Sequence, residues 1–189
     1  MLKENNMVEL YKTFGTIGFD NVKEISTELL PFQPSLIELC KQNSCGNYGK
    51  NYTCPPHIGE IDELIKKAKR FNTALVFQKV YRIEDSFDFE GMTEANDTFR
   101  KSVQRVNDFC KENLSEFLLL GAGGCKLCPT CGMETDEPCR FPDDALASLE
   151  SYGIFVSELA SVCGMNYING VNTVTYFGAL LYDKSTPVT

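Results

Sequence analysis

The stretch GAGGCKLCPTCGMETDEPCRFP, residues 121–142, holds four of the nine cysteines and decides how the rest of the chain is interpreted. The first three cysteines are spaced C-x2-C-x2-C, and the fourth follows after seven further residues. Consecutive x2 spacings let one wrapped loop supply thiolates to several irons of a cubane cluster, as in bacterial ferredoxins. Zinc sites more often use separated C-x2-C pairs. We therefore predict a [4Fe–4S] cluster, with zinc as the alternative, on four ligands: Cys125, Cys128, Cys131 and Cys139.

A second cysteine-rich stretch, CKQNSCGNYGKNYTCPP, covers residues 40–56. Its cysteines, Cys40, Cys45 and Cys54, lie among glycine and asparagine residues, a composition typical of an ordered loop. Such a stretch is poor core material, so it predicts a second metal or cluster site; core thiols and a zinc loop are the alternatives. The two remaining cysteines, Cys110 and Cys163, are expected in the core, and a ligand role stays open for Cys163.

The division of seven cysteines into four and three suggests two different sites. Four thiolates saturate a [4Fe–4S] cluster, which then only accepts and donates electrons. Three thiolates leave one iron open, where it can act as a Lewis acid and bind a small molecule, or capped by a ligand other than cysteine. A shared arrangement, with Cys139 joining Cys40, Cys45 and Cys54, is also consistent with two-cluster ferredoxins.

Two residues beside the cysteines are candidate functional residues. His57, the only histidine, follows Cys54 by three positions and is a candidate fourth ligand or proton donor; the alternative is a surface or structural histidine. Arg140 is a candidate to offset cluster charge or to hold an anionic substrate, and a surface salt bridge is the alternative. Four residues of the second stretch are candidates either to line a pocket at this site or only to order the loop: Tyr48, Lys50, Asn51 and Tyr52.

Length and composition are those of an ordinary globular protein. The 189 residues are most simply one domain, 1–189, with 43% hydrophobic and 23% charged residues. A net charge of −8 argues against nucleic acid, and no basic amphipathic or long apolar segment predicts a membrane partner. The chain starts without the apolar core of a signal peptide, so we expect a cytoplasmic protein whose thiols stay reduced.

Hydrophobic periodicity predicts an α/β fold: a mixed sheet of about four to five strands, flanked by helices and carrying the two cysteine loops. Expected strands cover 21–30, 73–83, 116–121 and 171–182; expected helices cover 35–42, 59–71, 93–113, 142–152 and 154–163. Pro142, Asp143 and Asp144 are typical of a helix start, which would put Cys139 and Arg140 beside its positive end. Residues 84–97 read as a solvated acidic connection, and the tail 185–189 is expected to fray.

With both cysteine sets in view, the chain resembles a prokaryotic family of predicted metal-binding proteins, domain of unknown function 2284. The matching motifs are C-x4-C-G-x-Y-G-K-N-x-x-C-P-P at 40–56, A-G-x-C-x-L-C-x-x-C with P-C-R-x-P at 122–142, and S-x-E-S-Y-G-I at 148–154. The resemblance spans most of the chain and includes seven of the cysteines. It implies a metal or iron–sulfur protein typical of anaerobes, and it implies no particular activity.

Three functions follow from these patterns. The first is a redox iron–sulfur protein with one or two [4Fe–4S] clusters, a redox partner protein and a small-molecule ligand at the three-cysteine site. The second is a zinc-binding structural or metal-carrier protein without catalysis. The third is a pure electron-transfer subunit of a larger complex, with two fully ligated clusters and no substrate pocket near His57.

Overall fold

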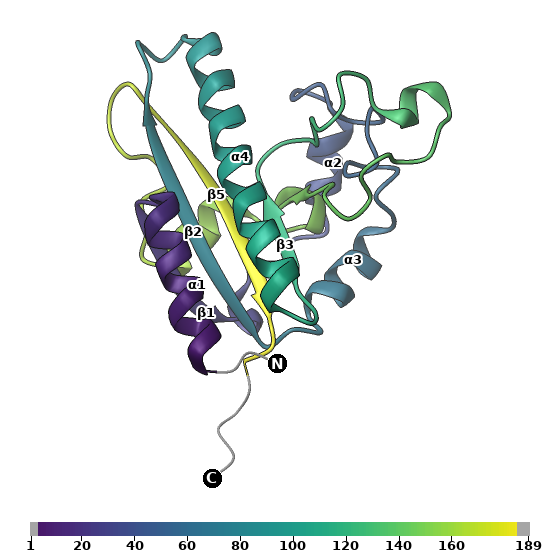
Figure 1. Ribbon diagram of the computed structural model, residues 1–189. Coiled ribbons are helices and arrows are strands. Elements are labelled where there is room, and N and C mark those ends of the chain that lie inside the picture. The colour runs from purple at the N-terminus through teal and green to yellow at the C-terminus, as the bar shows by residue number, and fades with distance from the viewer. Residues whose placement is uncertain (1–3, 185–189) are drawn as a thin grey trace.

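A five-stranded sheet in the order β1-β2-β5-β3-β4 runs through the protein, which the computed structural model describes over residues 4–184. Its strands are β1 (Asn21–Ser26), β2 (Thr73–Arg82), β3 (Leu118–Gly121), β4 (Ala147–Ser148) and β5 (Thr173–Tyr182). Neighbouring strands are antiparallel except β3 and β4, which are parallel. The α-helices are α1 (Glu4–Ile17), α2 (Leu36–Lys41), α3 (Ile61–Ala68), α4 (Phe89–Asn113) and α5 (Val156–Val162). The predicted α/β fold with a mixed sheet flanked by helices is therefore confirmed (Figure 1).

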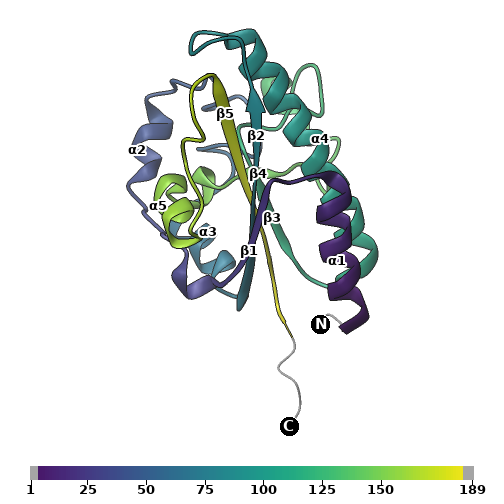
Figure 2. The same ribbon diagram turned by 90° about the vertical axis from the view of Figure 1, so that its left-hand side faces the viewer.

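Helices cover both faces of this sheet, as the edge-on view in Figure 2 shows. Successive residues of a strand point to opposite faces. In β2, Ala74 and Val76 join a hydrophobic core with α3 and α5, whereas Leu75 and Phe77 join a second core with α1 and α4. Because both faces are buried, β2 reads as a continuous apolar run rather than an alternating one.

Most predicted elements are present with shifted ends. The strands expected at 73–83, 116–121 and 171–182 are β2, β3 and β5, and the helices expected at 35–42, 59–71, 93–113 and 154–163 are α2, α3, α4 and α5. Helix α4 begins earlier than expected, inside the segment read as a loop, because the Asp88 side chain accepts a hydrogen bond from the Gly91 amide (2.8 Å) and caps it. The tail 185–189 lies outside the described residues.

The N-terminal part contains a helix that the sequence pattern did not predict. Helix α1 buries only a narrow stripe, including Leu10 and Phe14, within otherwise polar residues. The strand expected at 21–30 ends at Ser26, whose hydroxyl accepts a hydrogen bond from the Glu28 amide and starts the 3₁₀ helix η1 (Thr27–Leu29). Among residues 4–184, no helix has the length and apolar content needed to cross a bilayer.

The helix expected at 142–152 is wrong. The chain instead makes a turn at Phe141, forms the short strand β4 and then the 3₁₀ helix η3 (Glu150–Tyr152). The reason is tertiary: the Asp144 carboxylate accepts hydrogen bonds from three side chains of α4, and β4 pairs with β3. Those donors are Gln104, Asn107 and Lys111. Cys139 and Arg140 therefore do not lie beside a helix N-terminus.

One carboxylate connects three elements at the edge of the sheet. Glu24 of β1 accepts hydrogen bonds from Tyr11 of α1 (3.3 Å), from Tyr182 of β5 (3.0 Å) and from the Lys184 ammonium (2.7 Å). Partial burial alone would raise the pKa of Glu24, but the hydrogen bonds from Lys184, Tyr182 and Tyr11 and the Lys184 charge together lower it. The ionised form of Glu24 therefore stabilises the fold.

We predict that Glu24→Gln lowers the free energy of unfolding by about 1 kcal/mol at pH 7. Because the pKa is lower in the folded state, this stabilisation is present above the unfolded-state pKa of about 4.3 and is lost as the pH falls through the folded-state value. Denaturant unfolding of both proteins between pH 7 and pH 3 measures the difference. The exposed Glu28→Gln serves as the control and should change stability little; a Glu24 effect that does not shrink in acid would contradict the prediction.

Candidate metal centre

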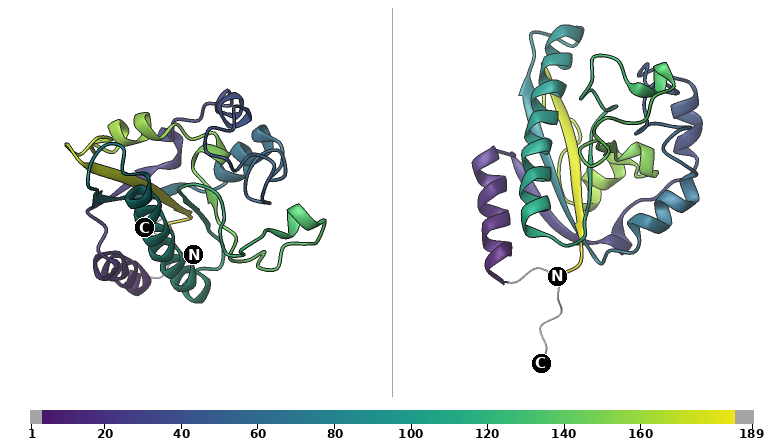
Figure 3. Two further views of the ribbon diagram at one scale, coloured as in Figure 1. Left: turned by 90° about the horizontal axis from the view of Figure 1, so that it is seen from above. Right: turned by 45° about the vertical axis from the view of Figure 1, so that its right-hand side comes forward.

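The two cysteine stretches lie side by side at one end of the sheet (Figure 3). Strand β3 ends at Gly121 and leads directly into the loop that carries Cys125. The Cys125 amide donates to the Thr53 hydroxyl (3.2 Å), and that hydroxyl donates to the Asn51 side-chain oxygen (2.9 Å). A second bridge runs from the Tyr52 hydroxyl to the Glu137 carbonyl (2.7 Å). Tyr52 and Asn51 thus order the loops, one of the two roles expected for them.

The loop of residues 40–56 is ordered by its own polar groups. Gly46 and Gly49 adopt left-handed backbone conformations, with φ of 73° and 71°, which favour glycine at these two turns. The Gly49 amide donates to the Pro55 carbonyl (2.8 Å), and the Asn43 side chain accepts from the Tyr48 amide (2.9 Å). These contacts close the loop and bring its three cysteines to one region.

The first set of thiols borders a common small hollow. Cys125, Cys128, Cys131 and Cys139 all line it, together with Gly132 and Arg140. Burial raises the pKa of the Cys125 thiol; a hydrogen bond from the Leu127 amide opposes this, and the charges of Cys139, Cys131 and Cys128 raise it further. The four cysteines are therefore close enough to act on one another.

The second set of thiols forms a separate electrostatic group. Burial raises the pKa of Cys54 to about 11, and the charges of Cys45 and Cys40 add to the effect, while hydrogen bonds with Asn51 and Thr53 oppose it. Burial also raises the pKa of Cys40, again with a contribution from Cys45. Cys110 and Cys163 are buried within the two hydrophobic cores, as expected.

The thiols do not converge on a point. Within residues 4–184, no three His, Cys, Asp or Glu side chains stand in the arrangement that holds a single metal ion.

The two candidate residues beside the cysteines differ in their surroundings. Arg140 forms an ion pair with Glu137 (2.6 Å) and donates a hydrogen bond to the Thr130 carbonyl (3.0 Å). The pKa of Arg140 is raised, mainly by Glu137 and to a smaller extent by Cys128. His57 is exposed, and its ring lies edge-on to that of Tyr52 at 6.5 Å.

One carboxylate near the second thiol set was not singled out from the sequence. Helix α2, which carries Cys40, packs against η3, which begins at Glu150. The Glu150 charge raises the pKa of Cys40. Glu150 itself keeps an exposed surface, and the protein around it raises its own pKa through burial. The only sequence signal for it is the S-x-E-S-Y-G-I motif at 148–154.

The comparisons with known proteins identify a family. Residues 23–182 match the family described as predicted metal-binding protein (DUF2284). No curated protein and no solved structure matches the chain. Because the matched segment spans both cysteine loops and nearly the whole sheet, the chain belongs to the DUF2284 family of predicted metal-binding proteins.

Proposed function

We propose that this metal-binding protein is an iron–sulfur protein with a redox function. One [4Fe–4S] cluster would be held by Cys125, Cys128, Cys131 and Cys139, and a second by Cys40, Cys45 and Cys54. The observation that carries the proposal is that four of the thiols border one small hollow, while the other three lie on the neighbouring loop. Such clusters supply one-electron transfer when they are bound.

The arrangement of the first thiol set is suited to holding a metal group of net negative charge. Its four thiols line a hollow whose walls include Gly132, where an added Cβ would lie 2.7 Å from the Glu137 carbonyl oxygen and 2.8 Å from that of Pro138. Glycine at this position lets the chain curl back on itself behind the thiols. Arg140 brings a positive charge to Cys128, which favours a bound group of net negative charge.

The second thiol set needs either an open iron or a further ligand, and Glu150, on the element that packs against the helix carrying Cys40, is a candidate besides His57. The Glu150 carboxylate acts on Cys40, whereas the ring contact of His57 is with Tyr52. Carboxylate oxygen is an accepted ligand of divalent metals. We propose that Glu150 caps this site.

The proposed function includes a reducing compartment and a redox partner protein. None of the nine cysteines, all of which fall within the described residues, forms a disulfide. Thiols persist in this state in the cytoplasm, which is where we propose that the protein works.

We predict about eight irons and eight sulfides per chain in protein purified without oxygen, as two cubanes require. Cys128→Ser and Cys45→Ser should each remove about half of the iron, because each removes a thiolate from a different set. Iron, sulfide and zinc analysis with EPR of the reduced protein measures this. Cys163→Ala, which changes a core thiol outside both sets, is the matched control and should keep its iron.

Three results would revise the proposal. Zinc without sulfide would replace it by a structural or carrier function. About four irons that Cys45→Ser does not reduce would confine the cluster to the first set. If both clusters persist when residues other than the cysteines are substituted one at a time, the result would favour an electron-transfer subunit with two fully ligated clusters.

We predict that Glu150→Gln alters the EPR signal of the second cluster and leaves that of the first unchanged, because it replaces the anionic oxygen next to Cys40 with a neutral amide. His57→Ala, which removes the other candidate ligand near this set, should leave both signals unchanged. The measurement is EPR of both variants, reduced without oxygen, together with iron per chain. A change in His57→Ala alone would assign the capping role to His57 instead.

A further inference from the structure

A cleft of about 790 Å³ lies between α4 and the cysteine loops. One wall is α4 with Arg100 and Lys101, another is the segment from Gly123 to Cys131, and a third is the loop with Lys50 and Asn51. Lys50 and Asn51, which were expected to line a pocket at the three-cysteine site or only to order the loop, line this different space. Its size suits a small metabolite.

The four-cysteine loop separates this cleft from the small hollow that its thiols surround. Cys125, Cys128 and Cys131 border both spaces, whereas Cys139 and Arg140 border only the small hollow. A molecule in the cleft would therefore lie against the loop that we propose holds the first cluster.

The cleft is locally basic in a chain whose net charge is −8. Four cationic residues line it, against the acidic residues Asp97, Glu134 and Asp144. Asp97 pairs with Arg100, and Asp144 pairs with Lys111, which is not part of the lining. Most of the acidic charge is thus already neutralised, while most of the basic charge is not.

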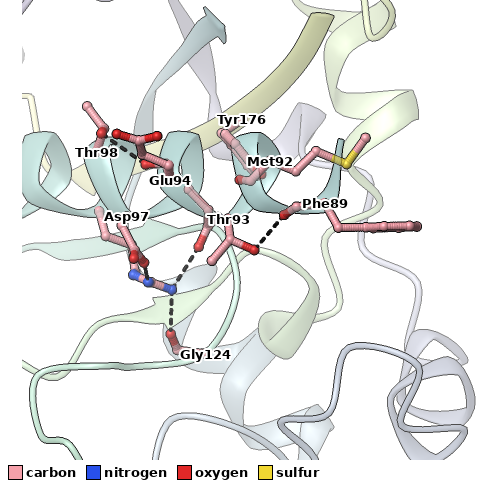
Figure 4. A network of polar contacts seen from close by, with 10 residues as sticks. Phe89, Met92, Thr93, Glu94, Asp97, Thr98, Gly124 and Tyr176 are labelled. Carbon is pink, nitrogen blue, oxygen red and sulfur yellow. Dashed lines mark hydrogen bonds and ion pairs between the residues drawn. The ribbon is translucent and has the colours of Figure 1, made fainter. Parts of the chain in front are cut away.

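Arg100 is fixed in place by α4 and by the cysteine loop. Its guanidinium donates to the side chain of Asn96 (2.7 Å), to the carboxylate of Asp97 and to the Gly124 carbonyl (3.4 Å). Figure 4 shows Asp97 on the helix and Gly124 on the loop, joined through this group. The side chain of Arg100 is only 20% exposed, so its guanidinium is held in a fixed position in the cleft and is not a flexible surface charge.

Three lysines complete the basic lining. Lys50, Lys101 and Lys126 come from three different segments and are exposed toward the cleft. Throughout the part of the chain that the structure describes, none of them has an acidic partner within ion-pair distance. Ammonium groups without protein partners, gathered around one concave space, attract anions.

We propose that this cleft binds a small polyanion that carries carboxylate or phosphate groups, directly beside the four-cysteine loop. Its link to the metal rests on the proposed function, under which a molecule bound there lies against the loop that holds the first cluster. Binding itself depends only on Arg100 and the three lysines. The cleft is thus distinct from the three-cysteine site, which is where the count of thiolates alone would place a small molecule.

The test is calorimetric titration of the protein, purified without oxygen, with sodium pyrophosphate and separately with trisodium citrate at constant ionic strength. We expect saturable binding of at least one probe at about one per chain; the tighter one shows whether phosphate or carboxylate is preferred. Lys101→Glu and Lys126→Glu should each weaken binding about tenfold. Lys67→Glu on α3, an exposed lysine outside the lining that changes the net charge equally, is the matched control.

Two results would overturn the proposal. One is the absence of saturable binding of either probe, which would mean that the basic lining only offsets the charge of the cysteine loop. The other is an equal loss in Lys67→Glu, which would mean that binding follows net charge and not the cleft. Metal analysis of the same sample keeps the two proposals apart: zinc with intact anion binding would refute the redox function alone, and iron–sulfur without anion binding would refute the cleft alone.

Discussion

The Thr53 hydroxyl links the two halves of the site, and the position of both cysteine sets depends on it. Thr53 and Asn51 are buried, at 5% and 4% exposure, and buried polar groups need partners. The Thr53 hydroxyl donates a hydrogen bond to the Asn51 side-chain oxygen and accepts one from the Cys125 amide. The close approach leaves no room for a side chain at position 124 unless Asn47 and Asn51 move, since a Cβ there would lie 2.5 Å from the Asn47 side-chain oxygen and 2.9 Å from the Asn51 side-chain nitrogen. Neither loop can shift without leaving a buried polar group unsatisfied.

The sheet supplies the second constraint, because it closes the base of the long loop between β3 and β4. Leu120 lies opposite Ala147 and Gly121 opposite Ser148, so the chain leaves and re-enters the sheet on adjacent strands. The Leu149 amide then donates to the Gly121 carbonyl (3.1 Å). A loop whose ends are fixed together loses less conformational entropy on ordering, which allows a polar, cysteine-rich segment to hold a defined shape. The same pairing continues into η3 and so determines where Glu150 lies.

The sequence pattern was sufficient wherever local periodicity and burial agree. Strands β2 and β5 and helix α4 have long apolar patterns, and cysteine spacing alone separated the two thiol sets. The pattern failed where tertiary contacts decide. Pro142 and Asp144 look like a helix start, but Asp144 is used by α4 and the following residues by β3. Helix α1 was missed because two buried side chains in a polar segment give little signal. Glu150 and the cleft lie beyond sequence reasoning for the same reason: each is formed by segments far apart in the chain.

Ligand counting and geometry lead to different locations for a small molecule. Three thiolates suggest an open iron, so counting assigns substrate to the second set. Transfer of an electron, however, requires closeness rather than a bond to iron, so a fully ligated cluster can serve a substrate held beside it. The cleft has this relation to the first set: Cys125, Cys128 and Cys131 form part of its wall, and its cationic groups come from Arg100 and the lysines. Under the proposed function, recognition of the anion and ligation of the metal would therefore belong to different side chains of the same loop region. A carboxylate ligand that completes the second set would then be compatible with a redox protein that acts on a small molecule.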